Sequence, residues 1–213
     1  MGLDRQREKR SRPVGHGRRL AQWLVLFTAL TPIGHLAAAP GPSGTYVVTQ
    51  ASDGGNTGAA GTLSWAIAQA NANPGSTIAF ASSLASQTVT LSAPLPVISS
   101  SVTIDGSGAA GLTISGNNQN RVFFVNGGRV TVANLTIANG SAQGGAGASG
   151  GGGGMGAGGA IFVNAGAVAV SNVSFANNTA AGGAGGNVTR GPGSSGGGGG
   201  GLGGAGGRPM DGA

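Results

Sequence analysis

Two stretches decide how this chain folds: FVNGGRVTVANLTIAN at residues 124–139 and FVNAGAVAVSNVSFAN at residues 162–177. They align at an offset of 38 residues without a gap, and Phe, Val and Asn recur in register. Chance matching of Gly and Ala does not explain that agreement. Self-similarity at a fixed period indicates a repeat architecture, in which each unit buries its apolar face against the next one.

Within each copy, apolar side chains alternate with small polar ones in short pieces such as Val130-x-Val132 and Leu135-x-Ile137. Alternation places both apolar side chains of a piece on one face of a strand. Other pieces of this kind begin at Val89, Val102, Leu112, Ile161, Val168 and Val173. Pieces of about three to five residues are shorter than hairpin sheets usually use. They predict a parallel β-helix, a solenoid in which equivalent strands of successive coils stack and their inward side chains form one core.

The spacing of the pieces supports this prediction. Leu112 and Leu135 begin equivalent pieces 23 residues apart, which suits one coil. The 38-residue offset is longer because residues 144–159 intervene, a stretch of Gly with Ala, Ser and Met155, and without these 16 residues the coil has 22. We interpret them as an insertion at a corner, a flexible or loosely packed loop, with a packed polyglycine-type sheet as the alternative.

Asn134 and Asn172 occupy the same place in the two copies, between two strand pieces. The chain must bend there, and Asn tolerates the left-handed backbone region better than most residues. We therefore predict a bend at each Asn and a ladder of stacked side chains between them.

A capping segment is expected before the coils. Residues 46–49 and 77–80 are predicted strands, and residues 62–72 form a predicted helix with Thr62 as its N-cap and Pro74-Gly75 after its end. Four residues share the apolar face of this helix: Leu63, Ala66, Ile67 and Ala70. A solenoid needs its open apolar end covered, so we expect the helix, with Trp65, to pack on the first coil.

The charge of the chain is concentrated at its start. Residues 1–39 hold seven basic and two acidic residues, whereas residues 40–213 hold four basic and three acidic ones. A nucleic-acid interface needs Lys and Arg spread over a face, so that class is excluded. Basic residues, an apolar run at 20–30 and small residues at 37–39 predict a secretory signal peptide, by the general or the twin-arginine route. The apolar run is too short to span a membrane.

Few groups for chemistry remain after residue 39. There is no Cys, His, Glu or Lys, and the carboxylates are Asp53, Asp105 and Asp211. Glycoside chemistry needs paired carboxylates and calcium sites need several, so we predict no enzyme, no catalytic or metal-binding residue and no cofactor. Asp105 is expected to form an Asx turn before Gly106. Arg121 and Arg129 are expected to lie solvated at the two turns of one strand.

Part of the chain resembles a known group of proteins. Asp53, GTLSWAIAQAN at 61–71 and GSTIAF at 75–80 resemble the N-terminal pattern D…GSLRxAIxxAN…TIxF of bacterial right-handed parallel β-helix proteins, with Ser64 in place of the usual Arg. This group includes passenger regions of autotransporters and polymorphic outer-membrane or adhesin-like proteins. The resemblance implies an all-β, right-handed parallel β-helix with a short N-terminal capping helix and Gly-rich insertions.

We therefore predict a signal peptide at 1–39, a strand–helix–strand cap at 40–80, coils at 81–180 with an insertion at 144–159, and a Gly-rich, disordered tail at 181–213. The predicted function is that of an exported, surface-displayed or secreted protein, a truncated adhesin-like or autotransporter passenger with a structural or binding role. Its partners would be a host surface, carbohydrate or other cell-surface molecules, with no nucleic acid and no membrane span in the mature chain. Two alternatives stay open: the N-terminal part of a carbohydrate-active β-helix enzyme, of lyase or hydrolase type, and a glycine-rich structural wall protein.

Overall fold

The computed structural model of the protein describes residues 42–148 and 151–187. The predicted signal peptide at 1–39 and the residues of the predicted tail from 188 onward lie outside the described residues. Everything below refers to the described part of the chain.

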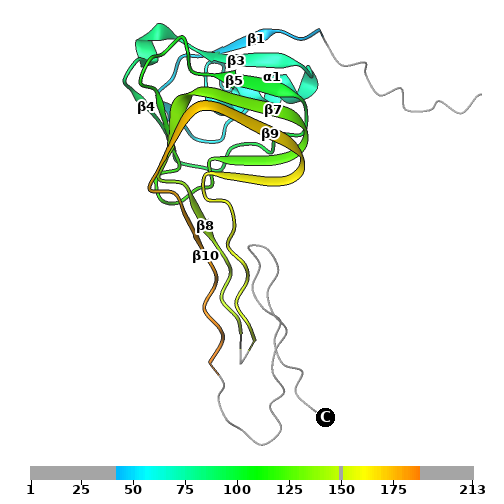
Figure 1. The fold of residues 1–213 in the computed structure, drawn as a ribbon, viewed down its shortest axis with the longest axis vertical. Helices are drawn as coiled ribbons and strands as arrows, with labels where there is room; N and C mark the ends of the chain where they lie inside the picture. The colour runs from blue at the N-terminus through cyan, green and yellow to red at the C-terminus, as the bar shows by residue number, and fades with distance from the viewer. Residues whose placement is uncertain (1–41, 149–150, 188–213) are drawn as a thin grey trace, which may run out of the picture. The chain divides into compact units, whose positions relative to one another are not determined.

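Strands are the main regular secondary structure of this part of the chain (Figure 1). They are β1 (Thr45–Val48), β2 (Ser52–Asp53), β3 (Ser76–Phe80), β4 (Thr88–Leu91), β5 (Val102–Asp105), β6 (Thr113–Ser115), β7 (Phe123–Ala138), β8 (Ser141–Gln143), β9 (Ile161–Ala176) and β10 (Thr179–Ala181). The α-helix α1 (Leu63–Ala72) and the short 3-10 helix η1 (Ser82–Leu84) lie between them.

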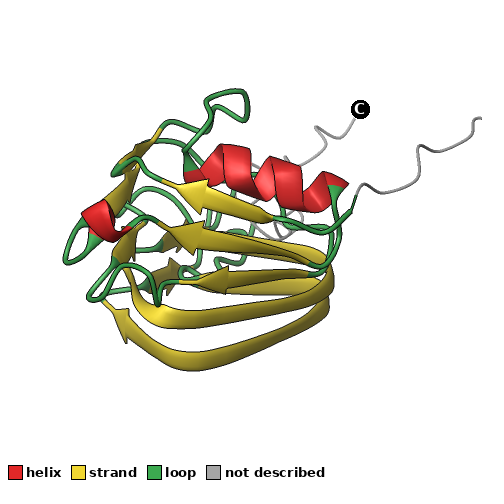
Figure 2. Ribbon diagram, turned by 90° about the horizontal axis from the view of Figure 1, so that it is seen from above, coloured by secondary structure: helices red, strands yellow, loops and turns green. Residues whose placement is uncertain are grey.

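The strands pair in parallel, and sequence neighbours are not sheet neighbours. The order in the main sheet is β1-β3-β5-β7-β6-β4-β2, with β9 paired to β7. The long β7 joins two rows, because Val130 pairs with Val102 of β5 while Ile137 pairs with Ile114 of β6. The sheet therefore curls round as a half-barrel with strands stacked along it (Figure 2). This arrangement contradicts antiparallel hairpins and confirms an all-β, parallel architecture.

The two repeat copies lie side by side in the predicted register. Val130 pairs with Val168, and Ile137 pairs with Phe175, so β7 and β9 match at the 38-residue offset. Asn134 and Asn172 have φ of 59° and 52°, and Asn172 Nδ2 donates to Asn134 Oδ1 at 3.0 Å. The predicted bends and the predicted ladder are both confirmed.

The helix α1 begins and ends where the sequence places it. Thr62 Oγ1 accepts a hydrogen bond from Trp65 N at 3.1 Å, which caps the first turn, and the helix ends before Asn73. The predicted apolar face is buried in the core: Leu63, Ala66, Ile67 and Ala70. Trp65 is half-buried and meets the Tyr46 ring edge-on, with the centroids 5.7 Å apart. The strand–helix–strand unit is therefore present, with β1 and β3 on either side of α1 in the sequence.

The core lies inside the curl of the sheet. Paired strands contribute aliphatic side chains that stack on one another. Val89 of β4, Ile114 of β6 and Ile137 of β7 form one such stack, and all three are buried. Burial decreases at β9, where Val168 and Val173 are only partly covered by the core. Exposed large apolar side chains on this strand are Val163, Val170 and Phe175.

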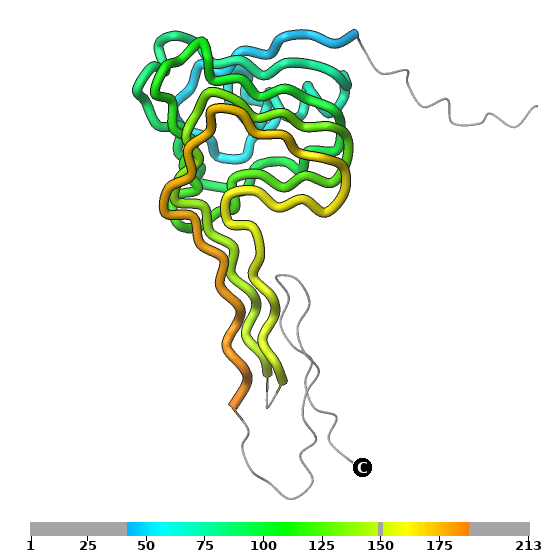
Figure 3. Tube along the Cα trace, viewed as in Figure 1, coloured from blue at the N-terminus to red at the C-terminus, as the bar shows by residue number. Residues whose placement is uncertain are grey.

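The glycine tract forms a packed arm rather than a loose loop. We use the name glycine arm for residues 140–148, 151–160 and 178–187, which run side by side away from the sheet (Figure 3). Backbone N–H groups link each segment to the others: Gly144 donates to Ala181 O, Gly183 to Gly154 O, and Gly154 to Gly145 O, at 2.7–2.8 Å. The expectation of a loosely packed loop was therefore wrong, and residues 182–187 belong to the arm.

The arm explains why glycine is needed at particular positions. A Cβ added at Gly153, Gly156 or Gly159 would lie 1.9–2.0 Å from a carbonyl oxygen of the neighbouring segment. These residues are three apart, and three residues per turn is the repeat of extended polyproline II-type chains. Close backbone approach at every third residue therefore selects glycine.

Candidate functional site

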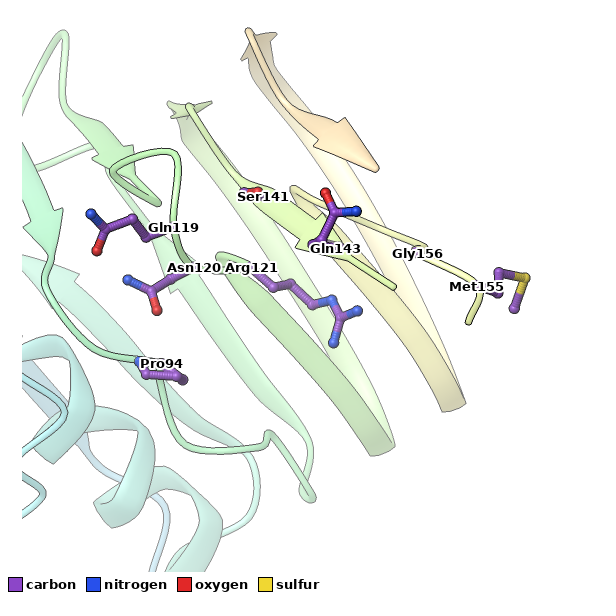
Figure 4. A pocket seen from close by; sticks show the side chains of 9 residues that line it. Pro94, Gln119, Asn120, Arg121, Ser141, Gln143, Met155 and Gly156 are labelled. Atoms are coloured by element: carbon purple, nitrogen blue, oxygen red, sulfur yellow. The ribbon is translucent and has the colours of Figure 1, made fainter. Parts of the chain in front are cut away.

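A hollow of about 270 Å³ lies where the glycine arm meets the sheet (Figure 4). Its lining includes the polar side chains of Gln119, Asn120, Arg121, Ser141 and Gln143. These residues come from the loop before β7 and from β8 in the first segment of the arm. Met155 and Gly156, from the second segment of the arm, also line the hollow. The lining mixes these polar side chains and one cation with the apolar Pro94, Ala142 and Met155, so we take this hollow as the candidate site among the described residues.

Arg121 is the central residue of this hollow. Its Nε donates to Gly158 O at 2.9 Å and its Nη2 donates to Ala157 O at 2.7 Å. The guanidinium also lies over two aromatic rings, 5.4 Å from the centroid of Phe124 and 4.9 Å from that of Phe162. Burial lowers the pKa of Arg121 from its ordinary value, but an arginine stays protonated at neutral pH. Arg121 therefore fastens the arm to the stacked rows through both hydrogen bonds and cation–π contacts.

The expectation for the two arginines holds for one of them. Arg129 is exposed, as predicted, whereas Arg121 is half-buried and bonded to the arm. The sequence shows Phe124 and Phe162 as repeat partners, but it does not show that residues 157–158 return beside them. That return depends on how the glycine arm folds, which local pattern does not reveal.

The polar groups of the hollow do not converge on one point. In Figure 4 the side chains of Gln119 and Asn120 point to the side opposite Arg121, and Met155 lies apart at the far end. Asn120 Nδ2 is used in a hydrogen bond to Leu91 O at 3.1 Å, and Asn120 O accepts from Ser141 N. These groups hold neighbouring segments together, and the lining contains no carboxylate or hydroxyl–base pair for catalysis.

Asp53 is a buried structural carboxylate. Its Oδ2 accepts from Ser64 N at 2.6 Å, while its Oδ1 accepts from Ser64 Oγ at 2.6 Å and from Gly55 N at 2.8 Å. A carboxylate at the first turn of a helix satisfies free N–H groups and complements the helix dipole. Asp53 therefore holds the turn after β2 against the start of α1, and Ser64 supplies two of its donors.

Asp105 forms the predicted Asx turn. Its Oδ1 accepts from Ser107 N at 2.9 Å and from Asn134 Nδ2 at 2.8 Å, and its Oδ2 accepts from Ser107 Oγ. The hydrogen bond from Asn134 and then the one from Ser107 N hold the pKa of Asp105 below its usual value, against a smaller opposing effect of burial. Asp105 thus begins a ladder that continues through Asn134 to Asn172. A second ladder, which sequence reasoning missed, joins Asn126 to Asn164 at 2.7 Å.

The described residues contain no group of three or more His, Cys, Asp or Glu side chains placed to hold a metal ion. None of their helices is long and apolar enough to cross a membrane. Asp211 lies outside the described residues. Comparison of the chain with protein-family models, with curated proteins and with solved structures found no match.

Proposed function

We propose that this chain is a right-handed parallel β-helix that is exported and displayed at a cell surface or secreted, and that its role is structural or adhesive rather than catalytic. The observation that carries the proposal is the stacking of equivalent strands. Ile78, Ile104, Val132 and Val170 pair in register from β3 to β9. A continuous inward row of this kind is what a solenoid core requires.

Three such rows support a closed coil rather than an open curved sheet. One row runs along β3, β5, β7 and β9, and a second runs along β4, β6, β7 and β9. A third row is formed by Ile98, Val125 and Val163, which pair in parallel where the chain returns between the other two. Each turn of the chain thus contributes one segment to each of the three rows, and each segment pairs with the equivalent segment of the previous turn.

The position of α1 supports the cap that the proposal assumes. Asn71 Nδ2 donates to Val97 O and Asn71 Oδ1 accepts from Ser99 N, which places the helix next to the first segment of the third row. Ser100 Oγ also donates to Ala70 O. The helix therefore occupies the place that a preceding strand of this row would take.

The carboxylates support a role without catalysis. Asp53 and Asp105 lie in separate turns, and both accept hydrogen bonds from neighbouring backbone and side chains. Glycosidases need a general acid and a second carboxylate about 5–10 Å apart across a substrate. On this proposal the outer faces, rich in Asn, Ser and Thr, would contact host-surface, carbohydrate or other cell-surface molecules.

Disulfide trapping tests the stacked coil, because the chain has no native cysteine. Thr103 and Thr131 are register partners on the adjacent strands β5 and β7 of one row, so the double variant Thr103→Cys/Thr131→Cys should close an intramolecular disulfide. The matched control Thr103→Cys/Thr136→Cys places the second cysteine on a different leg of β7 and should stay reduced. Equal oxidation of the two variants would contradict the stacking.

Export is tested separately by expressing the full chain with a C-terminal tag in a bacterial host. We expect mass spectrometry to show removal of about the first 39 residues and fractionation to place the product outside the cytoplasm. The control Leu24→Arg/Leu26→Arg interrupts the apolar run and should leave an unprocessed chain. Retention of the unaltered full-length chain in the cytoplasm would refute export, whatever the disulfide test shows.

A further inference from the structure

The strand β9 has one paired edge and one free edge among the described residues. It pairs with β7, and no described strand lies beyond it. As a result Val163, Val170 and Phe175 are 44%, 51% and 51% exposed, whereas their partners on β7 are Val125, Val132 and Ile137, each at most 1% exposed. The same inward pattern is therefore buried at β7 and open to solvent at β9.

Nothing on β9 protects this edge from pairing. Its 16 residues, IFVNAGAVAVSNVSFA, contain no charged residue and no proline. Edge strands of monomeric proteins are usually short, or carry a charge, a proline or a covering loop. A long, uncharged edge beside an open apolar core indicates a surface that another strand covers.

The positions of the bends make β9 symmetric about its own centre. The two residues with positive φ, Gly166 at 89° and Asn172 at 52°, each lie three positions from Ala169. Four of the inward residues follow the same symmetry, because Val168 and Val170 flank Ala169, and Val163 and Phe175 are each six positions away. The inward Val173 and Ile161 depart from it, with Ala165 and Asn177 at the mirrored positions. The two bends and these four apolar side chains are thus equally spaced in both directions along the strand.

This symmetry selects a second copy of the chain as the partner. Two strands that offer the same edge can pair only in the antiparallel direction, with a two-fold axis between them. About Ala169 such pairing sets Val163 opposite Phe175 and Val168 opposite Val170, with Gly166 opposite the bend at Asn172. The four side chains nearest this symmetry thus meet apolar partners and each bend meets a bend, while Val173 meets Ala165 and Ile161 meets Asn177.

We propose that two copies of this chain join end to end through antiparallel pairing of β9 with β9, about a two-fold axis at Ala169, so that each copy closes the open core end of the other. The arrangement is a closed dimer, because α1 covers the opposite end of the core, where Leu63 and Ile67 are buried. The inference rests on β9 alone and does not depend on export.

The glycine arm is compatible with this dimer. Its last segment, residues 178–187, follows β9 directly and carries only small side chains apart from Asn178 and Asn187. The strand β10 within this segment is exposed along its whole length. Within residues 178–187, therefore, no bulky or charged side chain stands between the two copies.

Disulfide capture of the full chain tests the axis directly. Residues opposite each other in an antiparallel pair have Cβ atoms about 4.5–5.5 Å apart, so Ala169→Cys should form an intermolecular disulfide under mild oxidation. The control Thr131→Cys lies at the equivalent place on β7, one strand further from the axis, and should yield at least about tenfold less dimer. Equal or greater dimer from the control would overturn the proposal.

Sedimentation of the full chain tests the interface without new cysteines. The unaltered chain and Ser171→Lys, whose side chain faces outward on the same leg, should be dimers at tens of micromolar. Val170→Lys places a charge in the apolar centre and should weaken the dimer by about tenfold or more. Because Val170 is half exposed in one copy, its replacement should leave the fold, followed by circular dichroism, unchanged.

Either of two results would overturn the proposal. The first is an unaltered chain that is monomeric at these concentrations. The second is a dimer that persists in Val170→Lys, which would show that the two copies associate through another part of the chain, such as residues 1–39. A monomer that dimerises only after deletion of residues 188–213 would assign the edge to the chain's own C-terminal residues.

Discussion

The two ends of the stacked core carry similar side chains but differ in what covers them. At the first end Val48 of β1 and Leu63 of α1 are fully buried within the unit formed by β1, α1 and β3. At the other end Val170 and Phe175 have inward-facing places in the same rows, yet about half of each side chain is exposed. The alternating apolar pattern of a strand therefore does not decide whether its side chains are buried; the segments packed against the strand do.

The same comparison extends to the polar groups. At the closed end Asp53 is buried and accepts three hydrogen bonds from the start of α1 and the turn beside it. Toward the open end the Asn ladder finishes at Asn172, which is exposed. Substitutions should therefore cost more free energy at the closed end, and the predictions below test that contrast in order of expected size.

The largest effect is expected for Leu63→Ala at the closed end. Removing a fully buried leucine side chain costs about 2–5 kcal/mol of the free energy of unfolding, through lost burial and the cavity that remains. In the monomer, at a protein concentration well below that at which the proposed dimer forms, Val170→Ala should cost less than about 1 kcal/mol, because half of the Val170 surface is in water. Urea unfolding of both variants at that low concentration measures the contrast, and equal losses would contradict it.

The next effect compares the two described carboxylates. Asp53→Asn keeps the shape but weakens acceptance from Ser64 and Gly55 in a buried place, and should cost about 1.5–3 kcal/mol. Asp105→Asn, in an exposed turn, should cost no more than about 0.5 kcal/mol. Urea midpoints again provide the measurement. A larger loss at Asp105 would contradict the expected greater cost at the buried carboxylate.

A smaller and more local effect is expected in the glycine arm beside the open end. A Cβ at Gly183 would lie 1.9 Å from Gly145 O, whereas at Gly182 the nearest atom is 3.6 Å away. Gly183→Ala should therefore cost about 1–2 kcal/mol and speed amide hydrogen exchange at residues 144–154. Its neighbour Gly182→Ala should leave exchange unchanged, so similar exchange in the two variants would argue against the packed arm.

The smallest effect is a dependence on pH. Because the pKa of Asp105 is lowered in the folded chain, its carboxylate favours folding above its unfolded value of 3.8, and this contribution is lost as the pH falls through the folded pKa. The stability difference between the unaltered chain and Asp105→Asn should thus be present at pH 5–6 and disappear in more acidic solution. Asn134→Ala removes the main cause of the shift and should shrink the pH-dependent part. A difference that grows on acidification would contradict the sign.

Much of the fold follows from local pattern. Thr62 was recognisable as an N-cap because a hydroxyl before an apolar helical stripe meets free N–H groups. Asn134 and Asn172 were recognisable as bends because Asn tolerates positive φ, and the repeat gave the register of β7 on β9. The strand limits differ from the short pieces expected from the sequence. β7 and β9 each continue through their bends as strands of 16 residues, because parallel pairing persists on both sides of each bend.

The candidate site was the part that sequence reasoning missed. Arg121 was expected in solvent because its partners, the carbonyl groups of Ala157 and Gly158, carry no side-chain signal. Gly153, Gly156 and Gly159 recur every three residues, but most residues around them are also glycine, so this period does not stand out in the sequence. Both features depend on backbone groups, which sequence patterns describe poorly.

Local sequence was enough to predict the alternation of the strands, the capped helix and the Asn bends, because each depends on a few consecutive residues and on the preferences of their own backbone. Long-range contacts were needed to show which strand edge stays free among the described residues, how the glycine segments pack, and that Arg121 binds the arm. These outcomes depend on which distant segments become neighbours, and a neighbour decides whether the same valine lies in a core, as at Val132, or in water, as at Val170.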